Sequence, residues 1–168
     1  SSEILTVISL IKIIDNPLLD IDFTSILRSY FARFTLNEIT EIRLINKDTS
    51  MYNAFLEYIE KTNNEKAIKF LSFLEDLKQI EKYLGVSEML NKILIDSGYL
   101  NYISLENNGE LKKANLKLFL KRAEEYEEIG NIGLHRFIKY LEKLETSSTD
   151  IASANIIGEK ENVVRIMT

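Results

Sequence analysis

The 168-residue chain contains no cysteine, one proline and six glycines. Without cysteine it can form no disulfide, no thiolate zinc site and no cysteine nucleophile, which fits a reducing cytosol. Because proline and glycine are the residues that most often interrupt helices, their scarcity favours long helices over many short strands. The apolar N-terminal segment contains Glu3, Lys12 and Asp15, is too short to span a bilayer and follows no basic region. We therefore expect a cytoplasmic protein without a membrane partner.

The overall composition is that of an ordinary soluble domain. Hydrophobic residues make up 45% of the chain and charged residues 28%, and the length suits one domain with its own core. The formal net charge of −5 argues against a uniformly basic surface for nucleic acid. A nucleic-acid contact would therefore have to be a local basic patch.

Apolar residues recur at helical spacing along most of the chain. Pro17 should end the first helix near Asp15, and Thr35 with Glu38 forms a capping box that starts another. Thr24 or Asp22 is expected to cap the second helix, and Gly85 to end the longest one. We expect helices that begin or end near these signals and cover 4–15, 25–31, 36–45, 51–61, 64–84, 88–96, 110–129 and 134–145. Ser50 and Ser87 are the expected starts of two of them.

The C-terminal residues depart from this helical pattern. The segment 146–150 (TSSTD) has the composition of a linker, and Val163, Val164, Ile166 and Met167 form a short run typical of a buried strand. A single strand in a helical chain has no sheet to join, so we expect it to belong to a neighbouring domain. The expected fold is all-α, a compact bundle of roughly eight or nine helices, with this short C-terminal strand segment.

The chain contains none of the common catalytic motifs. There is no GxxxxGK[ST] phosphate loop, and no serine or threonine stands in a recognisable nucleophile motif. The single histidine, His135, could in principle bind a metal with Glu142 or Glu145. A role as a half-buried helix residue is favoured about tenfold, because metal sites need several converging ligands. We expect no catalytic residue, no metal and no cofactor in this segment, and therefore no enzymatic activity of its own.

One stretch is unusually basic. Residues 111–123 carry five cations and no acid: Lys112, Lys113, Lys117, Lys121 and Arg122. Three of these lysines recur every fourth residue and would form one ridge on a helix. Glutamates follow the lysines, an order opposite to the one that the helix dipole favours. The five residues are candidate DNA phosphate contacts, although composition alone favours a solvated face with Lys121 paired to Glu125 by about two to one.

Several segments together resemble a known family. They are IKIIDNPLLDIDFTSILRS (11–29), FTLNEITEIRL (34–44), GELKKANLKLFLKRAEEYE (109–127), GLHRFIKYLEKLE (133–145) and GEKENVVRIMT (158–168). In order and spacing they are similar to the 2B subdomain region of AddA (RexA) type ATP-dependent helicase/nuclease subunits, which are relatives of UvrD and Rep in helicase superfamily one. The similarity covers essentially the whole chain.

The resemblance implies a domain division and a set of partners. Residues 1–158 would be a helical, non-catalytic 2B-like accessory domain, and 159–168 would start the returning strand of the 2A motor domain. The parent would be a helicase/nuclease of double-strand-break repair and recombination that uses ATP and Mg. Its expected partners are duplex DNA, bound weakly and without sequence specificity, the rest of the parent chain and the AddB (RexB) type subunit.

The family pattern can be followed residue by residue. Lys112 takes a position that is usually basic in relatives, and Asn115 and Tyr126 match residues that recur there. Glu110 departs from the pattern, because relatives often carry lysine at that position.

A second departure lies near the start of the chain, where Tyr30 replaces a typical proline. In UvrD-like relatives the turn that follows is glycine-rich and contacts duplex DNA. Here it reads Ala32-Arg33-Phe34-Thr35, so that contact is not carried over to Phe34 and Thr35. Three hypotheses follow for the whole chain. It is a domain that engages DNA through the five basic residues, or a module that packs on the motor domains or the AddB-type partner. The third, a stand-alone helical enzyme, is the weakest because the sequence holds no catalytic constellation.

Overall fold

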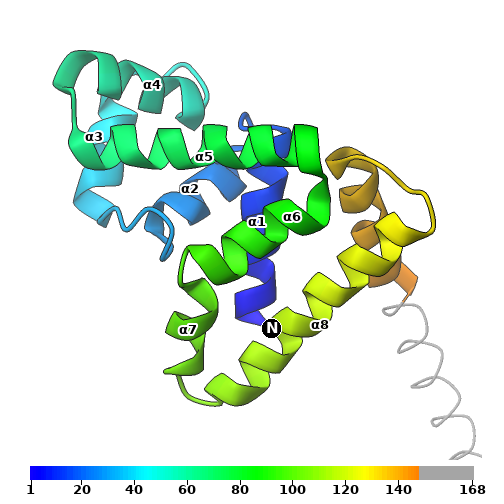
Figure 1. Cartoon of the computed structure of the whole chain (residues 1–168). Helices are drawn as coiled ribbons and strands as arrows, with labels where there is room; N and C mark the ends of the chain where they lie inside the picture. The colour runs from blue at the N-terminus through cyan, green and yellow to red at the C-terminus, as the bar shows by residue number, and fades with distance from the viewer. Residues whose placement is uncertain (148–168) are drawn as a thin grey trace, which may run out of the picture.

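The computed structural model describes residues 1–147, and every regular element in that range is helical (Figure 1). In chain order the elements are α1 (Ser2–Asp15), α2 (Asp20–Arg28), α3 (Leu36–Ile45), α4 (Met51–Thr62), α5 (Glu65–Leu84), α6 (Val86–Asn91), the π-helical turn η1 (Lys92–Asp96), α7 (Tyr99–Ser104) and α8 (Gly109–Glu128), followed by a helix over 134–147. The expected all-α bundle is confirmed. The expected strand and the boundary at 158 lie outside the described residues, as does the end of the linker-like segment.

Helix α1 lies at the centre of the bundle. In Figure 1 it runs from the N-terminus beside α8, behind α6, to the long helix α5. It contacts α2, α5 and α8, and buries five of its apolar side chains almost completely: Val7, Leu10, Ile11, Ile13 and Ile14. Burial of this apolar surface from water is the main force that holds the surrounding helices on α1. None of the helices in 1–147 is both long and apolar enough to cross a bilayer.

Aromatic side chains hold the outer helices in three clusters. The first joins α2, α4 and α5 through the rings of Phe23, Phe55 and Phe70, with centroids 5.5–6.3 Å apart. The second joins the α2–α3 loop to α5 and α7 through the rings of Tyr30, Phe31, Phe73, Tyr99 and Tyr102. The third packs 134–147 on α8 through Phe119, Tyr126, Phe137 and Tyr140. Such edge-to-face and offset pairs add to the stability gained from burial.

Most helix boundaries follow the sequence signals. Helix α1 ends at Asp15, and the Glu38 N–H donates to the Thr35 hydroxyl over 3.2 Å at the start of α3. The Asn53 N–H donates to the Ser50 hydroxyl over 3.1 Å at the start of α4. These three predictions are confirmed.

The second predicted helix is wrong at both ends. Helix α2 starts at Asp20 and ends at Arg28, whereas the prediction was 25–31 with a cap at Thr24 or Asp22. Helix α2 stops early because the Ser29 hydroxyl donates to the Ile26 carbonyl over 2.7 Å. The loop then folds back, and the Phe34 N–H donates to the Leu27 carbonyl over 2.8 Å.

Three helix starts receive a carboxylate from a different helix. The first few N–H groups of a helix have no partner within it, so an outside acceptor stabilises the end. Asp20 accepts from the Met51 N–H (2.9 Å), Glu127 from the N–H groups of Val86 (3.1 Å) and Ser87 (2.6 Å), and Glu81 from the Leu134 N–H (3.1 Å). The prediction that Ser87 starts this helix as its cap is therefore wrong. The Ser87 N–H lies inside α6 and donates to the Glu127 carboxylate.

Gly85 makes the cap at α6 geometrically feasible. Its φ of 98° and ψ of 179° lie in a region that is essentially restricted to glycine. A Cβ at this position would lie 2.4 Å from Glu127 Oε2, far inside van der Waals contact. The glycine therefore both ends α5 and lets the Glu127 carboxylate approach the α6 backbone.

We expect Glu127→Ala to lower the free energy of unfolding by about 1–2 kcal/mol, the usual cost of a lost helix cap. The substitution leaves two N–H groups of α6 without their acceptor. Urea unfolding followed by circular dichroism measures the change. Glu128→Ala is the matched control, because Glu128 is the exposed neighbour on the same helix. Equal stabilities of the two variants would contradict the cap.

Candidate nucleic-acid interface

Helix α8 presents the predicted lysine ridge to solvent. The helix buries Leu116, Phe119 and Ala123 against the bundle. Lys113, Lys117 and Lys121 advance about 40° per step around the axis, away from that face. Lys117 and Lys121 are exposed and Lys113 is half-buried.

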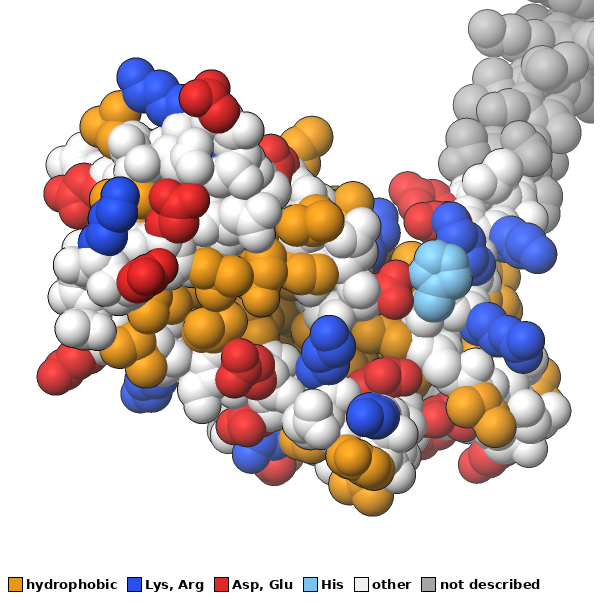
Figure 2. Space-filling model, turned by 90° about the horizontal axis from the view of Figure 1, so that it is seen from above, with side chains coloured by type: hydrophobic (Ala, Val, Ile, Leu, Met, Phe, Trp, Pro, Cys, Tyr) orange, Lys and Arg blue, Asp and Glu red, His pale blue; other side chains and the backbone are white. Residues whose placement is uncertain are grey.

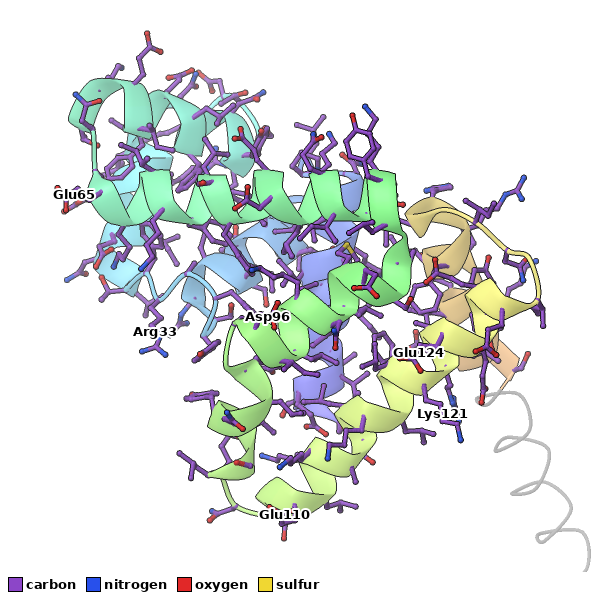
Figure 3. The ribbon with its side chains drawn as sticks, in the orientation of Figure 1. Arg33, Glu65, Asp96, Glu110, Lys121 and Glu124 are labelled. Atoms are coloured by element: carbon purple, nitrogen blue, oxygen red, sulfur yellow. The ribbon has the colours of Figure 1, made fainter. Side chains whose placement is uncertain are left out.

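These three lysines have no acidic partner. Within 1–147 none of them forms an ion pair or a hydrogen bond, so the alternative pairing of Lys121 with Glu125 is not formed. Glu110 stands one turn before Lys113, and Glu124 one turn after Lys121. Figure 3 shows Lys121 pointing away from the bundle, with Glu110 at the start of the helix. The ridge is therefore three lysines long and has an acid near each end.

The other two predicted contacts lie elsewhere. Lys112 faces the loop before α8, where its Nζ lies 2.7 Å from Glu106 Oε2. The hydrogen bond to Glu106 raises the pKa of Lys112. Arg122 projects from another flank of α8, about 140° around the axis from Lys117, and lines a hollow with Arg136. The structure therefore brings together three of the five predicted residues and separates Lys112 and Arg122 from them.

Asn115 and Tyr126 have structural roles. The Asn115 side-chain amide donates to Glu3 Oε1 over 3.3 Å and so joins α8 to the start of α1. Burial raises the pKa of the Glu3 carboxyl, but the Ser1 side chain, the backbone and Asn115 favour the charged form, and the net direction is downward. Tyr126 stacks on Tyr140 with ring centroids 4.9 Å apart.

The turn 32–35 is occupied by internal contacts. The Phe34 N–H donates to the Leu27 carbonyl, Phe34 as a whole is only 3% exposed, and the Thr35 hydroxyl caps α3. Neither residue offers a free backbone or hydroxyl group to a phosphate. Arg33 adopts a left-handed conformation with φ of 60° and places its guanidinium 4.6 Å from the Tyr30 ring centroid.

Lys66 of α5 ties this turn to the bundle. Its Nζ lies 2.5 Å from Glu38 Oε2, donates to the Arg33 carbonyl over 3.0 Å and sits 4.5 Å from the Phe34 ring centroid. The hydrogen bond from Lys66 lowers the pKa of Glu38. The turn is thus fixed by one lysine that makes three contacts.

A hollow lies beside this turn. It measures about 870 Å³ and has Tyr30, Phe31 and Phe73 among its lining side chains. Its lining carries charges of both signs: Arg33, Lys66, Lys69 and Lys92 are basic, and Glu65, Asp76 and Asp96 are acidic. Figure 3 labels Arg33, Glu65 and Asp96. Lys66 and Lys92 already face the carboxylates of Glu38 and Asp96. The hollow is therefore poorly suited to a polyanion.

His135 differs from its prediction. The side chain is 68% exposed, not half-buried, because Leu134, Phe137 and Ile138 take the inward positions of this helix. Its Nδ1 lies 2.9 Å from Asp15 Oδ2, and Glu142 instead faces Lys139. In residues 1–147 no three His, Cys, Asp or Glu side chains gather as metal ligands would.

Sequence reasoning missed a second basic row. Arg136, Lys139 and Lys143 follow one another at spacings of three and four, the same pattern that singled out the lysines of α8. With Arg122 they line a hollow of about 680 Å³ between α8 and the following helix. Sequence reasoning searched for a basic stretch free of acids, and it passed over this row because Glu142 lies within it and Glu145 just after it.

Comparison with known proteins identifies relatives over the whole chain. The A subunit of the ATP-dependent helicase/nuclease from Thermoanaerobacter pseudethanolicus is 38% identical in a match that covers 100% of this chain and 14% of that protein. The proteins of the same name from Ruminiclostridium cellulolyticum and Acetivibrio thermocellus are 36% and 37% identical over 99% of the chain. The chain is homologous to one segment of these A subunits.

The predicted resemblance is thereby confirmed for the sequence as a whole. The chain spans about 14% of the length of the A subunits that it matches. No family model matches it.

We expect Glu38 to titrate below the ordinary pKa of a glutamate, and Lys66→Met to return it toward that value. Because the folded-state pKa is lowered, the contact contributes stability above the unfolded-state pKa and loses it as the pH falls through the folded-state pKa. Carboxyl NMR titration of both proteins measures the shift. Lys69→Met, on the same helix, should leave Glu38 unchanged. An unaltered Glu38 titration in Lys66→Met would show that the ion pair does not form.

Proposed function

We propose that the chain is a non-catalytic accessory domain within an ATP-dependent helicase/nuclease and engages duplex DNA ahead of the motor. The observation that carries the proposal is the ridge of Lys113, Lys117 and Lys121, which extends from α8 without an acidic partner in 1–147. The similarity to helicase/nuclease A subunits supplies the context. The process served would be double-strand-break repair and recombination in the cytoplasm.

The chemistry of this contact is electrostatic. The ridge is about 12 Å long, since eight residues of helix separate its ends. Phosphates of one DNA strand follow one another every 3.4 Å or so along the axis, so the ridge faces several of them. Lysine amines would displace condensed counterions from these phosphates and position the duplex without reading its sequence.

The catalytic parts of the parent lie elsewhere in this proposal. ATP and Mg would bind to motor domains outside this chain, and the chain itself would hold no cofactor. Its protein partners would be those motor domains and an AddB-type subunit.

A second candidate is a protein-interaction module without DNA contact. Figure 2 shows hydrophobic side chains gathered in one patch on the upper face of the molecule. A contiguous apolar patch is typical of a surface that packs on another protein. Under this alternative the lysine ridge would only keep the domain soluble, and binding would depend little on salt.

We expect the chain to bind duplex DNA weakly, and the lysine ridge to contribute about −3 to the log–log salt slope through its three phosphate contacts. Changing Lys113, Lys117 and Lys121 to glutamate should flatten this slope and weaken binding equally for all sequences. Fluorescence anisotropy over a salt series measures both effects. Lys47, Lys61 and Lys78, which are exposed on other elements, changed together to glutamate, provide the charge-matched control.

The two triple variants separate the candidate functions. Equal loss in both would mean that only net charge matters, and the ridge would not be a site. In the full heterodimer the ridge variant should impair duplex unwinding more than ATP hydrolysis stimulated by single strands. Normal unwinding by that variant at physiological salt would favour the protein-interaction module.

We also expect the purified chain to hydrolyse no ATP and to degrade no DNA, because its sequence contains neither a phosphate loop nor a recognisable nuclease motif. A coupled ATPase assay and a nuclease assay on labelled duplex test this expectation. Turnover that survives repurification and exceeds that of a mock preparation would contradict it.

A further inference from the structure

A second basic surface lies between α8 and the helix over 134–147. The hollow of about 680 Å³ between them is lined by five basic side chains from the two helices: Arg122, His135, Arg136, Lys139 and Lys143. Figure 2 shows several blue side chains around the pale-blue histidine, with red side chains also beside it. In a chain with a net charge of −5, this local excess of cations is a departure that needs a cause.

Few acids neutralise this groove. Glu125 is the one acid among its lining residues, Lys139 lies 3.3 Å from Glu142, and His135 lies 2.9 Å from Asp15. Arg122, Arg136 and Lys143 have no acidic partner in residues 1–147. The groove thus keeps a clear positive excess.

Packing holds these cations together. Phe137 is fully buried and contacts Phe119 and Tyr126, and Tyr140 stacks on Tyr126 at 4.9 Å. Glu81 fixes the start of the helix through the Leu134 N–H. The two walls of the groove are therefore positioned by apolar contacts and a cap, and like charges are kept near one another although they repel. A bound polyanion would relieve that repulsion.

The side chains that line the groove suit phosphate. Two guanidiniums face the hollow from different helices, and the planar guanidinium matches phosphate oxygens with two parallel hydrogen bonds. The half-buried rings of Tyr126 and Tyr140 form part of the lining, which suits sugar and base edges as well as phosphates. A nucleic-acid backbone offers several phosphates in a row to a set of four permanent cations.

We propose that this groove binds the sugar-phosphate backbone of DNA, as a contact separate from the lysine ridge on the other flank of α8. The inference rests on the proposed function in one respect, because it takes DNA to be the polyanion that this domain meets. Arg122 belongs to this groove and not to the ridge. Helix α8 thus presents cations to DNA on two flanks, and the helix over 134–147 completes the groove on one of them.

Amine footprinting of the unaltered 168-residue chain tests the groove and the ridge in one experiment. Lysines are acetylated with and without a short blunt DNA duplex and quantified by mass spectrometry. We expect acetylation of Lys139 and Lys143 to fall several-fold with DNA, while Lys61 and Lys78, exposed on other helices, remain unchanged. Polyglutamate of equal charge, tested in parallel, should give no such protection.

The outcomes distinguish the two proposals. Protection of Lys113, Lys117 and Lys121 without protection of Lys139 and Lys143 would overturn the groove and leave the proposed function standing. Protection of Lys139 and Lys143 alone would support DNA binding in the groove and contradict DNA binding by the lysine ridge. No protection at either site would overturn both, and protection of the groove by polyglutamate but not by DNA would reassign it to an acidic polypeptide.

A variant pair provides a second measurement. Arg136→Gln with Lys143→Gln should reduce the magnitude of the log–log salt slope of DNA binding by about 2, one for each lost phosphate contact. Lys61→Gln with Lys78→Gln is the matched control and should leave the slope unchanged. Far-UV circular dichroism verifies that both variants keep the helical fold. An unchanged slope in the folded groove variant would contradict the proposal.

Discussion

Carboxylates that cap the helices of their neighbours determine how this bundle is assembled. Asp20, Glu81 and Glu127 each lie on one helix and accept N–H groups at the start of another. Hydrophobic burial around α1 brings the helices together with their apolar faces inward, but it is non-directional and does not hold the end of one helix at a particular place on the next. The caps are directional, because a carboxylate must lie close to particular N–H groups. Glu127 thereby fixes α8 against the α5–α6 turn, and Glu81 fixes the helix over 134–147 against α5.

These caps also explain part of the charge order that the sequence shows on α8. Glutamates at the end of a helix oppose its own dipole, but Glu127 serves the dipole of α6 instead. The reversed order of lysines and glutamates therefore does not by itself indicate a function for the lysines. What favours a role in binding is their lack of acidic partners within the described residues. Glu110 and Glu124 limit the length of the ridge without neutralising it.

Local signals in the sequence predict local structure well. Pro17, Thr35, Ser50 and Gly85 each mark a helix boundary that the structure confirms, because each acts through its own backbone or a side chain within one turn. The end of α2 and the cap of α6 were missed, because they depend on Phe34 folding back and on Glu127 arriving from elsewhere in the chain. For the candidate interface, spacing alone found Lys113, Lys117 and Lys121 on one flank. It could not separate Lys112 and Arg122 from them, nor bring Arg136 near Arg122, since these relations arise from tertiary packing.

The π-helical turn η1 determines where the residues directly after it lie around the helix axis. The Ser97 N–H reaches back five residues to the Lys92 carbonyl over 3.1 Å, so this turn holds one residue more than an α-helical turn. The extra residue shifts Ser97 by about 100° around the axis relative to an unbroken helix, and Gly98, with φ of 81°, then separates η1 from α7. In this place the Ser97 carbonyl accepts a hydrogen bond from the Tyr30 hydroxyl over 2.7 Å, and Tyr99 and Ile103 of α7 lie in the core. A single-residue deletion within 92–96 would leave the helical propensity of the segment intact, yet it would displace the Ser97 carbonyl from the Tyr30 hydroxyl.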